Sequence, residues 1–149
     1  MASDVAVDAS PQVGQPIPGR PTIRVDRVLI ARFAGASRDF NPIHVDEEFA
    51  RNAGLPTVIA HGAISLGLAG RLLSDWVGLT GVHSLNAKLV APAFPGDELV
   101  AEGEIMSVTE DGRAGVRLRV RKQGTETDTV TAEAVVTLPA TAAGSRRAM

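Results

Sequence analysis

The sequence contains no cysteine, and this absence narrows the possible chemistry at once. A disulfide framework, a thiolate-ligated metal site and a cysteine nucleophile are all excluded. The fold of this 149-residue chain therefore depends on an apolar core. A chain of this length buries about two thirds of its extended surface, which is enough for a core without covalent cross-links. We expect one compact domain.

The chain also lacks a strong charge imbalance and a long apolar run. Its formal net charge is −2, with acidic and basic residues interspersed, so nucleic acid is not an expected partner. The longest mainly apolar stretch, residues 62–78, is interrupted by Arg71, Ser74 and Asp75, which argues against a membrane span. The first 19 residues have neither the basic start nor the apolar run of a secretory signal. We expect a cytoplasmic protein without a membrane partner.

Periodic placement of apolar residues is confined to the middle of the chain. Residues 1–19 and 140–149 show none and are predicted to be flexible tails, which leaves one domain at residues 20–139. Within it, residues 22–25 favour a short strand, and Asp26 is placed to cap a helix that ends near Asp39.

The next part of the chain contains a break and two further helices. Asn41-Pro42 interrupts the first helix, because proline removes a donor and pushes its predecessor out of helical geometry. Asp46 suits the N-cap of a short helix that stops at Gly54. Residues 62–77 then carry apolar side chains around most of the helical circumference, which predicts a long helix buried on several sides and packed on a sheet.

After residue 78 the apolar period changes from that of a helix to two, which indicates antiparallel strands with one core face each. Leu99, Ala101 and Ile105, for example, alternate with acidic residues. The pattern predicts consecutive strands that follow one another as a meander, at residues 82–90, 98–108, 114–122 and 127–138. The fold class is therefore α+β, with a sheet around one buried helix, and dimerisation is the simplest way to cover the sheet's free edges.

Asp39 and His44 are the leading candidates for chemistry. They stand five residues apart on either side of the Asn41-Pro42 turn, at the ends of a short, irregular segment, so their side chains can converge on one cleft. A carboxylate and an imidazole that contact one water or one hydroxyl can move protons in both directions near neutral pH. The same residues also suit a plain turn followed by a helix start, and spacing does not decide between the two interpretations.

His61-Gly62 is the second candidate, because Gly62 opens the long helix. The first N–H groups of a helix have no intrahelical acceptor, and the missing side chain lets a carbonyl oxygen approach closely. Such donors can stabilise the enolate-like charge that develops on a thioester carbonyl. A plain glycine at a helix start explains the same pattern.

Other chemistries fit less well. Ser65 lies within A-I-S-L-G at a mid-helix position, without the exposed elbow of a serine hydrolase. Asp39, His44 and Asp46 offer few nitrogen donors for a zinc site, so no metal is expected. A glycine-rich phosphate loop is also missing from the sequence.

A basic strip of alternate arginines, Arg117, Arg119 and Arg121, has two interpretations. It could meet the phosphates of coenzyme A or an acidic carrier protein. Alternatively, Glu102 and Glu104 on the preceding strand pair with it across the sheet, which is the simpler explanation. The arginines are therefore not assigned to a site.

Three stretches of the chain carry distinctive motifs, namely F-A-G-A-S-R-D-F-N-P-I-H-V-D-E-E-F-A at residues 33–50, A-H-G-A at 60–63 and A-P-A-F-P-G-D-E-L at 91–99. Together they resemble the family of MaoC-like dehydratases and R-specific enoyl-CoA hydratases. The likeness spans residues 13–139 and is similar also to subunits of 3-hydroxyacyl-carrier-protein dehydratases. It implies a hotdog fold, in which an antiparallel sheet wraps around a long central helix and pairs of such folds associate through their sheets.

The resemblance also implies roles for individual residues. Asp39 and His44 become the catalytic pair, Asn41 holds their loop or the reacting water, and the Gly62 N–H polarises the thioester carbonyl. No metal or redox cofactor is implied. The family often has glycine where this chain has Arg38, and methionine where it has Ala63, a substrate-pocket position. These two differences concern the loop and the acyl pocket rather than the proton-transfer groups.

The predicted function is reversible hydration of trans-2-enoyl thioesters to (R)-3-hydroxyacyl thioesters, carried on coenzyme A or an acyl-carrier protein. Two alternatives stay open. A hotdog thioesterase would direct water at the carbonyl and release a free thiol, and an accessory subunit would complete a heterodimeric dehydratase. The chain is expected to act as a homodimer or as a heterodimer with a related hotdog subunit.

Overall fold

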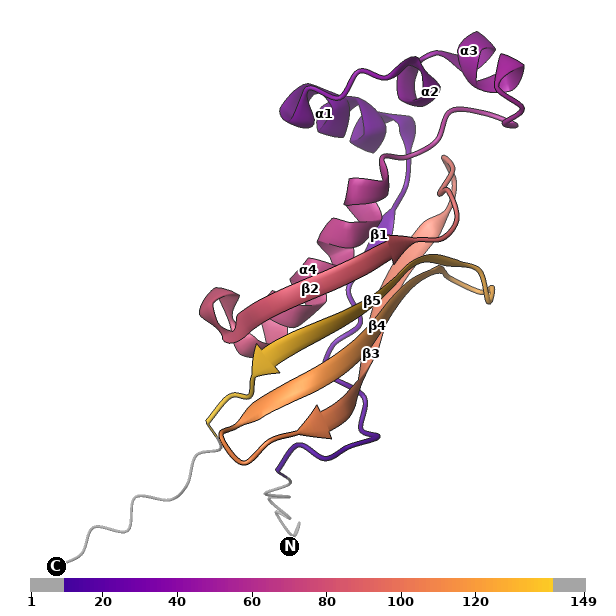
Figure 1. Cartoon of the computed structure of the whole chain (residues 1–149). Helices are drawn as coiled ribbons and strands as arrows, with labels where there is room; N and C mark the ends of the chain where they lie inside the picture. Colours follow the sequence, from indigo (N-terminus) through magenta and orange to yellow (C-terminus); the bar gives the residue numbers. More distant parts are fainter. Residues whose placement is uncertain (1–9, 141–149) are drawn as a thin grey trace, which may run out of the picture.

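The structure is a computed structural model that describes residues 10–140. In chain order its elements are β1 (Thr22–Arg24), α1 (Arg27–Ser37), α2 (Pro42–Val45), α3 (Glu47–Asn52), α4 (Gly62–Val77), the 3-10 turn η1 (Leu79–Gly81), β2 (Val82–Leu89), β3 (Glu98–Val108), β4 (Arg113–Lys122) and β5 (Asp128–Thr137). Figure 1 shows α4 against one face of the sheet, with α1 to α3 grouped beyond its N-terminal end. This arrangement confirms the α+β prediction of a sheet around a long helix.

The five strands form one antiparallel sheet in the order β1-β3-β4-β5-β2. The strands β3 to β5 make the predicted meander. The prediction that β2 also precedes β3 in space is wrong, because β2 pairs with β5 at the opposite edge. Residues 90–97 connect β2 to β3 and contain Pro92 and Pro95, which suit an extended crossing rather than a tight hairpin turn.

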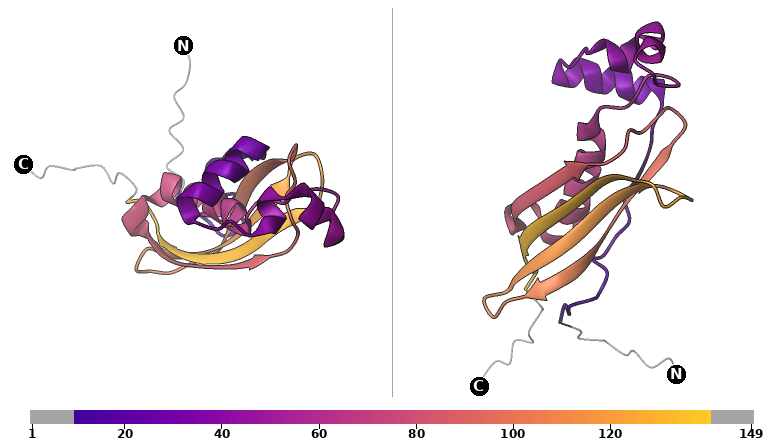
Figure 2. Two further views of the ribbon diagram at one scale, coloured as in Figure 1. Left: turned by 90° about the horizontal axis from the view of Figure 1, so that it is seen from above. Right: turned by 45° about the vertical axis from the view of Figure 1, so that its right-hand side comes forward.

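The long helix α4 provides the centre of the core. Its largest buried side chains, Leu72 and Leu73, are at most 1% exposed and face the concave side of the sheet, which curls around the helix in Figure 2. On β4, Leu118 and its alternate neighbours are buried while the intervening arginines face away from α4. The predicted bounds of α4 and β3 agree with the structure. No helix among the described residues has the length and apolar character needed to cross a membrane.

The ordered fold begins before residue 20, where the sequence placed a boundary. The N–H groups of Gly14 and Ile17 donate to carbonyls of β3, and Pro16 forms an isolated bridge with Glu104. Ile17 is 4% exposed and belongs to the core. A single apolar residue in a proline-rich stretch produces no periodic pattern, so this attachment had no signal in the sequence. The other predicted tail, residues 140–149, lies almost entirely outside the described residues.

The three short helices form a separate layer, residues 26–60, at the N-terminal end of α4 (Figure 2). The predicted caps are present, because Asp26 accepts the Leu29 N–H at 2.7 Å and Asp46 accepts the Phe49 N–H at 3.0 Å. The segment after Asn41 was predicted to be irregular, but it forms the single turn α2. Proline disrupts a helix interior and yet suits the first helical position, where its missing N–H costs nothing.

Candidate active site

Asp39 lies in the loop between α1 and α2. The helix α1 ends at Arg38, which adopts the left-handed conformation with a φ of 58°. Glycine enters this conformation without strain, which accounts for its frequency at this position in the family that the sequence resembles. The Asp39 side chain is 52% exposed, and its Oδ1 accepts the Asn41 N–H at 3.3 Å. The Asp39 carboxylate is therefore exposed to solvent, and its hydrogen bond to Asn41 stabilises the turn at residues 39–41.

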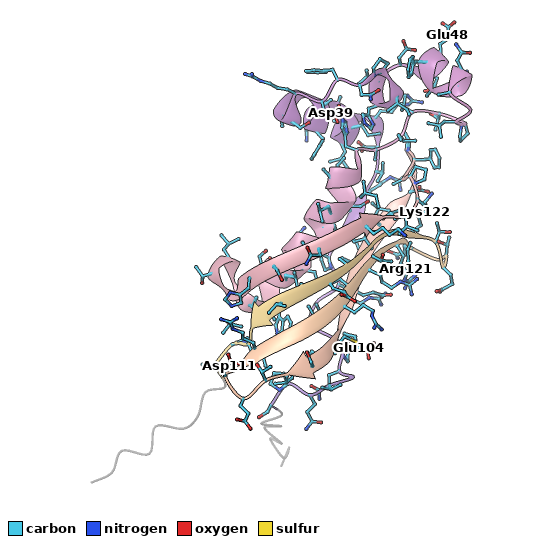
Figure 3. The ribbon with its side chains drawn as sticks, viewed as in Figure 1. Asp39, Glu48, Glu104, Asp111, Arg121 and Lys122 are labelled. Atoms are coloured by element: carbon cyan, nitrogen blue, oxygen red, sulfur yellow. The ribbon has the colours of Figure 1, made fainter. Side chains whose placement is uncertain are left out.

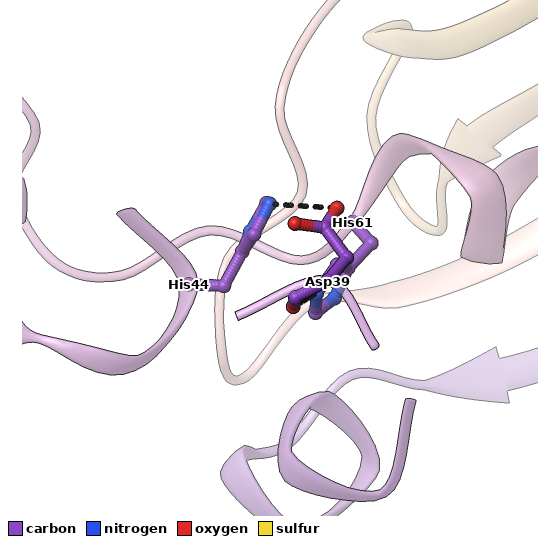
Figure 4. A group of neighbouring side chains, drawn as sticks. All are labelled: Asp39, His44 and His61. Atoms are coloured by element: carbon purple, nitrogen blue, oxygen red, sulfur yellow. Dashed lines mark hydrogen bonds and ion pairs between the residues drawn. The ribbon is translucent and has the colours of Figure 1, made fainter. Parts of the chain in front are cut away.

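His44 lies on α2 with its ring oriented by the main chain. Its Nδ1 is 2.7 Å from the carbonyl oxygen of Ile59. A carbonyl oxygen only accepts, so Nδ1 carries the proton and Nε2 of the neutral ring keeps a free lone pair. This Nε2 lies 3.9 Å from Oδ2 of Asp39 (Figure 4). The separation is too long for a direct hydrogen bond and leaves both atoms free to contact one water molecule.

His61 completes the cluster, and the sequence did not assign it to the site. Its side chain is buried, and its ring stacks on that of His44 with centroids 3.8 Å apart and planes 23° apart. The Phe33 ring of α1 packs against the His61 ring in a tilted arrangement, with the ring centroids 4.8 Å apart. Its Nε2 donates to the main-chain carbonyl of Asp39 at 3.0 Å, and its Nδ1 is buried without a partner among the described residues. The sequence singled out His61 only as the neighbour of Gly62.

Gly62 opens α4 beside this cluster, at a pocket of about 260 Å³. The pocket is lined on one side by His44, His61, Gly62 and Ser65, and on the other by apolar residues of the β2–β3 connection. A Cβ at position 62 would lie 2.6 Å from Cδ1 of Leu89, so any other residue would require Leu89 to shift. The first N–H groups of a helix have no intrahelical acceptor and can donate to an oxygen atom in the pocket.

The remaining predicted site residues lie around this pocket rather than in it. Asn41 is the N-cap of α2, and its Oδ1 accepts the Ile43 N–H at 3.1 Å. This contact supports the loop-holding role that the resemblance implies. Ala63 is exposed on the first turn of α4 and is not one of the pocket-lining residues. Its place in an acyl pocket stays a prediction. Ser65, which the sequence did not assign to the site, is buried within α4 and does line the pocket.

Within residues 10–140, Asp39, His44 and His61 are the one group of histidine and carboxylate side chains close enough together to hold a metal ion. One potential ligand atom from each lies within 4.8 Å of the others. The two imidazoles, however, are stacked nearly parallel, so their in-plane lone pairs do not converge on one point. Zinc and similar ions require ligands about 2.0–2.2 Å away in a tetrahedral or octahedral arrangement. The geometry suits proton transfer better than coordination, and the expectation of no metal stays a prediction.

The basic strip on β4 lies on the opposite face of the sheet, beside a larger hollow of about 680 Å³. Its charges are largely neutralised by acidic neighbours. Arg121 donates to Glu102 at 2.9 Å, and this hydrogen bond holds the pKa of Glu102 below its usual range. Arg119 pairs with Asp128 at 2.7 Å. The predicted pairing with the preceding strand is confirmed for Arg121, whereas Arg119 pairs with Asp128 of β5 instead, and neither Asp39 nor His44 lines the hollow. Figure 3 shows Arg121 and Asp39 well apart along the molecule.

A sheet curled around one helix, with His44 and Asp39 beside the helix N-terminus, is an arrangement suited to acid–base chemistry. The comparisons identify the family. Residues 8–134 match the family model described as the MaoC like domain, and the chain belongs to this family. Its architecture is the hotdog fold, as the resemblance implied.

The relatives share both sequence and structure with the chain. It is 38% identical over 133 residues to the (R)-specific enoyl-CoA hydratase of Aeromonas caviae, covering 86% of this chain and 96% of that protein. The solved (R)-hydratase of A. caviae superposes with a TM-score of 0.75 at 35% identity, covering 87% of this chain and 98% of that one. A 3-hydroxyacyl-thioester dehydratase of Mycobacterium tuberculosis is 39% identical over 101 residues, 65% of this chain and 33% of that protein.

Proposed function

We propose that the protein is a hydro-lyase that reversibly hydrates trans-2-enoyl thioesters to (R)-3-hydroxyacyl thioesters. The observation that carries the proposal is the 3.9 Å gap between Asp39 Oδ2 and His44 Nε2 beside the open N-terminus of α4. This gap accommodates a water molecule. A thioester substrate whose carbonyl is bound at the N-terminus of α4 would lie next to that water. The relative from A. caviae, named as an (R)-specific hydratase, supports the same reaction and stereochemistry.

In the proposed reaction, one water molecule is held between Asp39 and His44. It loses a proton to one of them as its oxygen attacks the β-carbon of the enoyl group, and the α-carbon gains a proton from the pair. The result is addition of H and OH across the double bond, with no change of oxidation state. Dehydration runs through the same steps in reverse. The free lone pair on His44 Nε2 makes this atom a competent base.

The thioester carbonyl is expected to lie against Gly62. During attack at the β-carbon, negative charge develops on the carbonyl oxygen, and N–H groups of the α4 N-terminus can stabilise it. The pocket then receives the acyl chain, since its lining continues into the apolar residues Leu89, Val90 and Pro92. The acyl group is carried as a thioester on coenzyme A or on an acyl-carrier protein, and the reaction needs no redox cofactor.

The proposed assembly is a dimer joined through β2. This strand occupies an edge of the sheet, and a free edge of this length is a template for pairing with another strand. Large apolar side chains near the site are also uncovered, namely Phe40, Phe49, Leu89 and Val90. A solved relative, the ChsH1-ChsH2 complex of M. tuberculosis, has a TM-score of 0.74 at 28% identity over 86% of this chain and 98% of that chain. Sedimentation equilibrium tests the proposal, and a mass of 15.5 kDa would contradict it for the chain alone.

The test of the activity is direct. The purified chain is incubated with trans-2-enoyl-CoA substrates of several lengths, following loss of the conjugated enoyl-thioester absorbance and, separately, free thiol. The wild type is expected to hydrate without thiol release. Asp39→Asn and His44→Ala should each lose about 10²–10⁴-fold in kcat, the usual contribution of a positioned acid or base. Asp75→Asn is the matched control for Asp39→Asn, because the Asp75 side chain is 63% exposed on α4 and does not line the pocket, so kcat should be unchanged.

The other outcomes separate the alternatives. Release of one free thiol for each thioester consumed, abolished in Asp39→Asn and His44→Ala, would show that the protein is a thioesterase and not a hydratase. Absence of turnover with both acyl-CoA and acyl-carrier-protein substrates would overturn an independent catalytic function and favour an accessory subunit. The cytoplasmic location stays a prediction that this experiment does not address.

A further inference from the structure

We propose that His61 is a positioning residue that holds Asp39 in its working place through a single hydrogen bond to the main chain. The inference deepens the proposed function and rests on it. The position of Asp39 needs an explanation. Asp39 must place its carboxylate accurately beside His44, and yet its side chain is half exposed and lies in a loop at the edge of the molecule. Something outside the loop has to define its position.

The loop's own hydrogen bonds cannot do this, because they are local. Asp39 N–H donates to Ser37 Oγ at 3.3 Å, and Asn41 N–H donates to Asp39 Oδ1 at 3.3 Å. These bonds shape the turn but leave its placement relative to α4 open. Among the described residues, the bond from His61 Nε2 to the Asp39 carbonyl is the one hydrogen bond that ties residues 39–41 to a distant part of the chain. It spans 22 residues and joins the loop to the start of the rigid helix.

His61 itself is fixed from every side. It is 3% exposed, its ring contacts the rings of His44 and Phe33, and it is the N-cap residue of α4. Its main-chain carbonyl accepts the Ile64 N–H at 2.9 Å. Because the His61 ring is buried and has little freedom to move, it fixes the positions of Asp39 and His44 relative to α4. It stacks on His44 and bonds to Asp39, so the same residue sets the distance between them.

The hydrogen bond also defines the proton on His61. A carbonyl oxygen accepts only, so Nε2 carries the hydrogen and Nδ1 of the neutral ring is left as an unpaired acceptor. A buried polar atom without a partner is costly, and another aromatic residue would avoid the cost. The Nε2 donor is the feature that a phenylalanine would lack. This makes the donor, rather than the ring, the property that the site requires.

The test compares side chains that differ in this donor. His61→Gln and His61→Met are similar in size and flexibility, and only glutamine offers an N–H near the position of Nε2. The methionine variant is expected to lose on the order of 10²-fold in kcat with little change in KM, since a misplacement of about 1 Å costs this much in rate. The glutamine variant should recover most of the loss. Ser74→Ala is the control for removing a side-chain hydrogen bond to the main chain elsewhere, on α4, and should match the wild type.

The outcomes are separable from those of the proposed function. Equal losses in His61→Gln and His61→Met, or full kcat in His61→Met, would overturn the positioning role while wild-type hydration stands. If His61→Met does not fold, His61→Phe takes its place, because it keeps the buried ring and lacks the donor. Hydrogen exchange of the Asn41 N–H provides a readout without substrate. It should quicken in the methionine or phenylalanine variant and not in the glutamine variant, and equal exchange in all of them would reject the inference.

Discussion

The body of the molecule and its helical layer are held together in different ways. The body, α4 with the sheet, is stabilised by long antiparallel ladders and by a continuous buried core. The layer, residues 26–60, adds a few side chains such as Ile30 and Val58 to the same core, but its short helices also depend on local caps such as Asp26 and Asp46, and it leaves Phe40 exposed. The proposed proton-transfer groups lie on the layer. The proposed chemistry therefore lies outside the part of the structure that supplies most of the buried core.

A few hydrogen bonds in the layer and at its junction with the body hold the proposed catalytic side chains in position. Within the layer, His44 Nδ1 bonds to the Ile59 carbonyl and Ile59 N–H bonds to the Ile43 carbonyl. Ala60 N–H bonds to the Ala93 carbonyl of the β2–β3 connection, and the His61 contact joins the layer to the start of α4. Substitutions in the body should lower stability without altering the chemistry, and substitutions in the layer or at the junction should do the reverse.

The largest effect is expected in the body, from Leu72→Ala. Leu72 is 1% exposed on α4, and a buried leucine replaced by alanine typically costs 2–5 kcal/mol, so a loss of about 3 kcal/mol in the free energy of unfolding is expected. Urea unfolding measures it. Leu79→Ala, at a side chain 85% exposed, should change stability by less than about 0.5 kcal/mol. A folded Leu72→Ala protein with strongly reduced kcat would show that the two regions are not separate.

Sequence patterns predicted the body well because its elements are long and strongly periodic. The bounds of α4 and β3 follow from side-chain alternation over many residues. The position of β2 beside β5 was not predictable, since strand order depends on where the connection 90–97 crosses and not on the strand's own pattern.

In the site, local signals reached Asp39, His44 and Gly62, but not His61. The role of His61 depends on its contact with Asp39, 22 residues away, and on stacking with His44, and neither leaves a mark on the neighbouring sequence. The helix α2 was missed for a different reason. Asn41-Pro42 was interpreted as a breaker, although asparagine at the N-cap followed by proline also opens a helix.

The second prediction concerns the junction, through Gly62→Ala. The added Cβ would displace Leu89, which is 61% exposed and free to move, so stability should change little. The methyl group would, however, stand beside the N–H groups proposed to bind the thioester carbonyl. We expect kcat/KM to fall by on the order of 10²-fold, comparable to the loss of one oxyanion donor. Gly35→Ala on α1, where a Cβ meets nothing within 4 Å, is the control and should retain activity. Unchanged kcat/KM in Gly62→Ala would remove Gly62 from the proposed site.

The smallest effect, and the sharpest comparison, is expected within the layer itself. Asn41 caps α2, which carries His44, whereas Asp46 caps α3, which carries no proposed catalytic group. Removing a cap costs about 1 kcal/mol, so Asn41→Ala and Asp46→Ala should have similar, modest effects on the melting temperature. Only Asn41→Ala should lower kcat, by roughly fivefold if that local free energy is lost from the ordering of His44.

Asn41→Ser keeps a capping oxygen and should restore most of this activity. The three variants together decide how the layer works. If Asp46→Ala lowers kcat as much as Asn41→Ala, the three helices respond as one unit, and the position of His44 depends on the whole layer. If only Asn41→Ala does so, each turn is ordered by its own cap, and the orientation of His44 on α2 depends on the Asn41 cap in addition to the His61 contact.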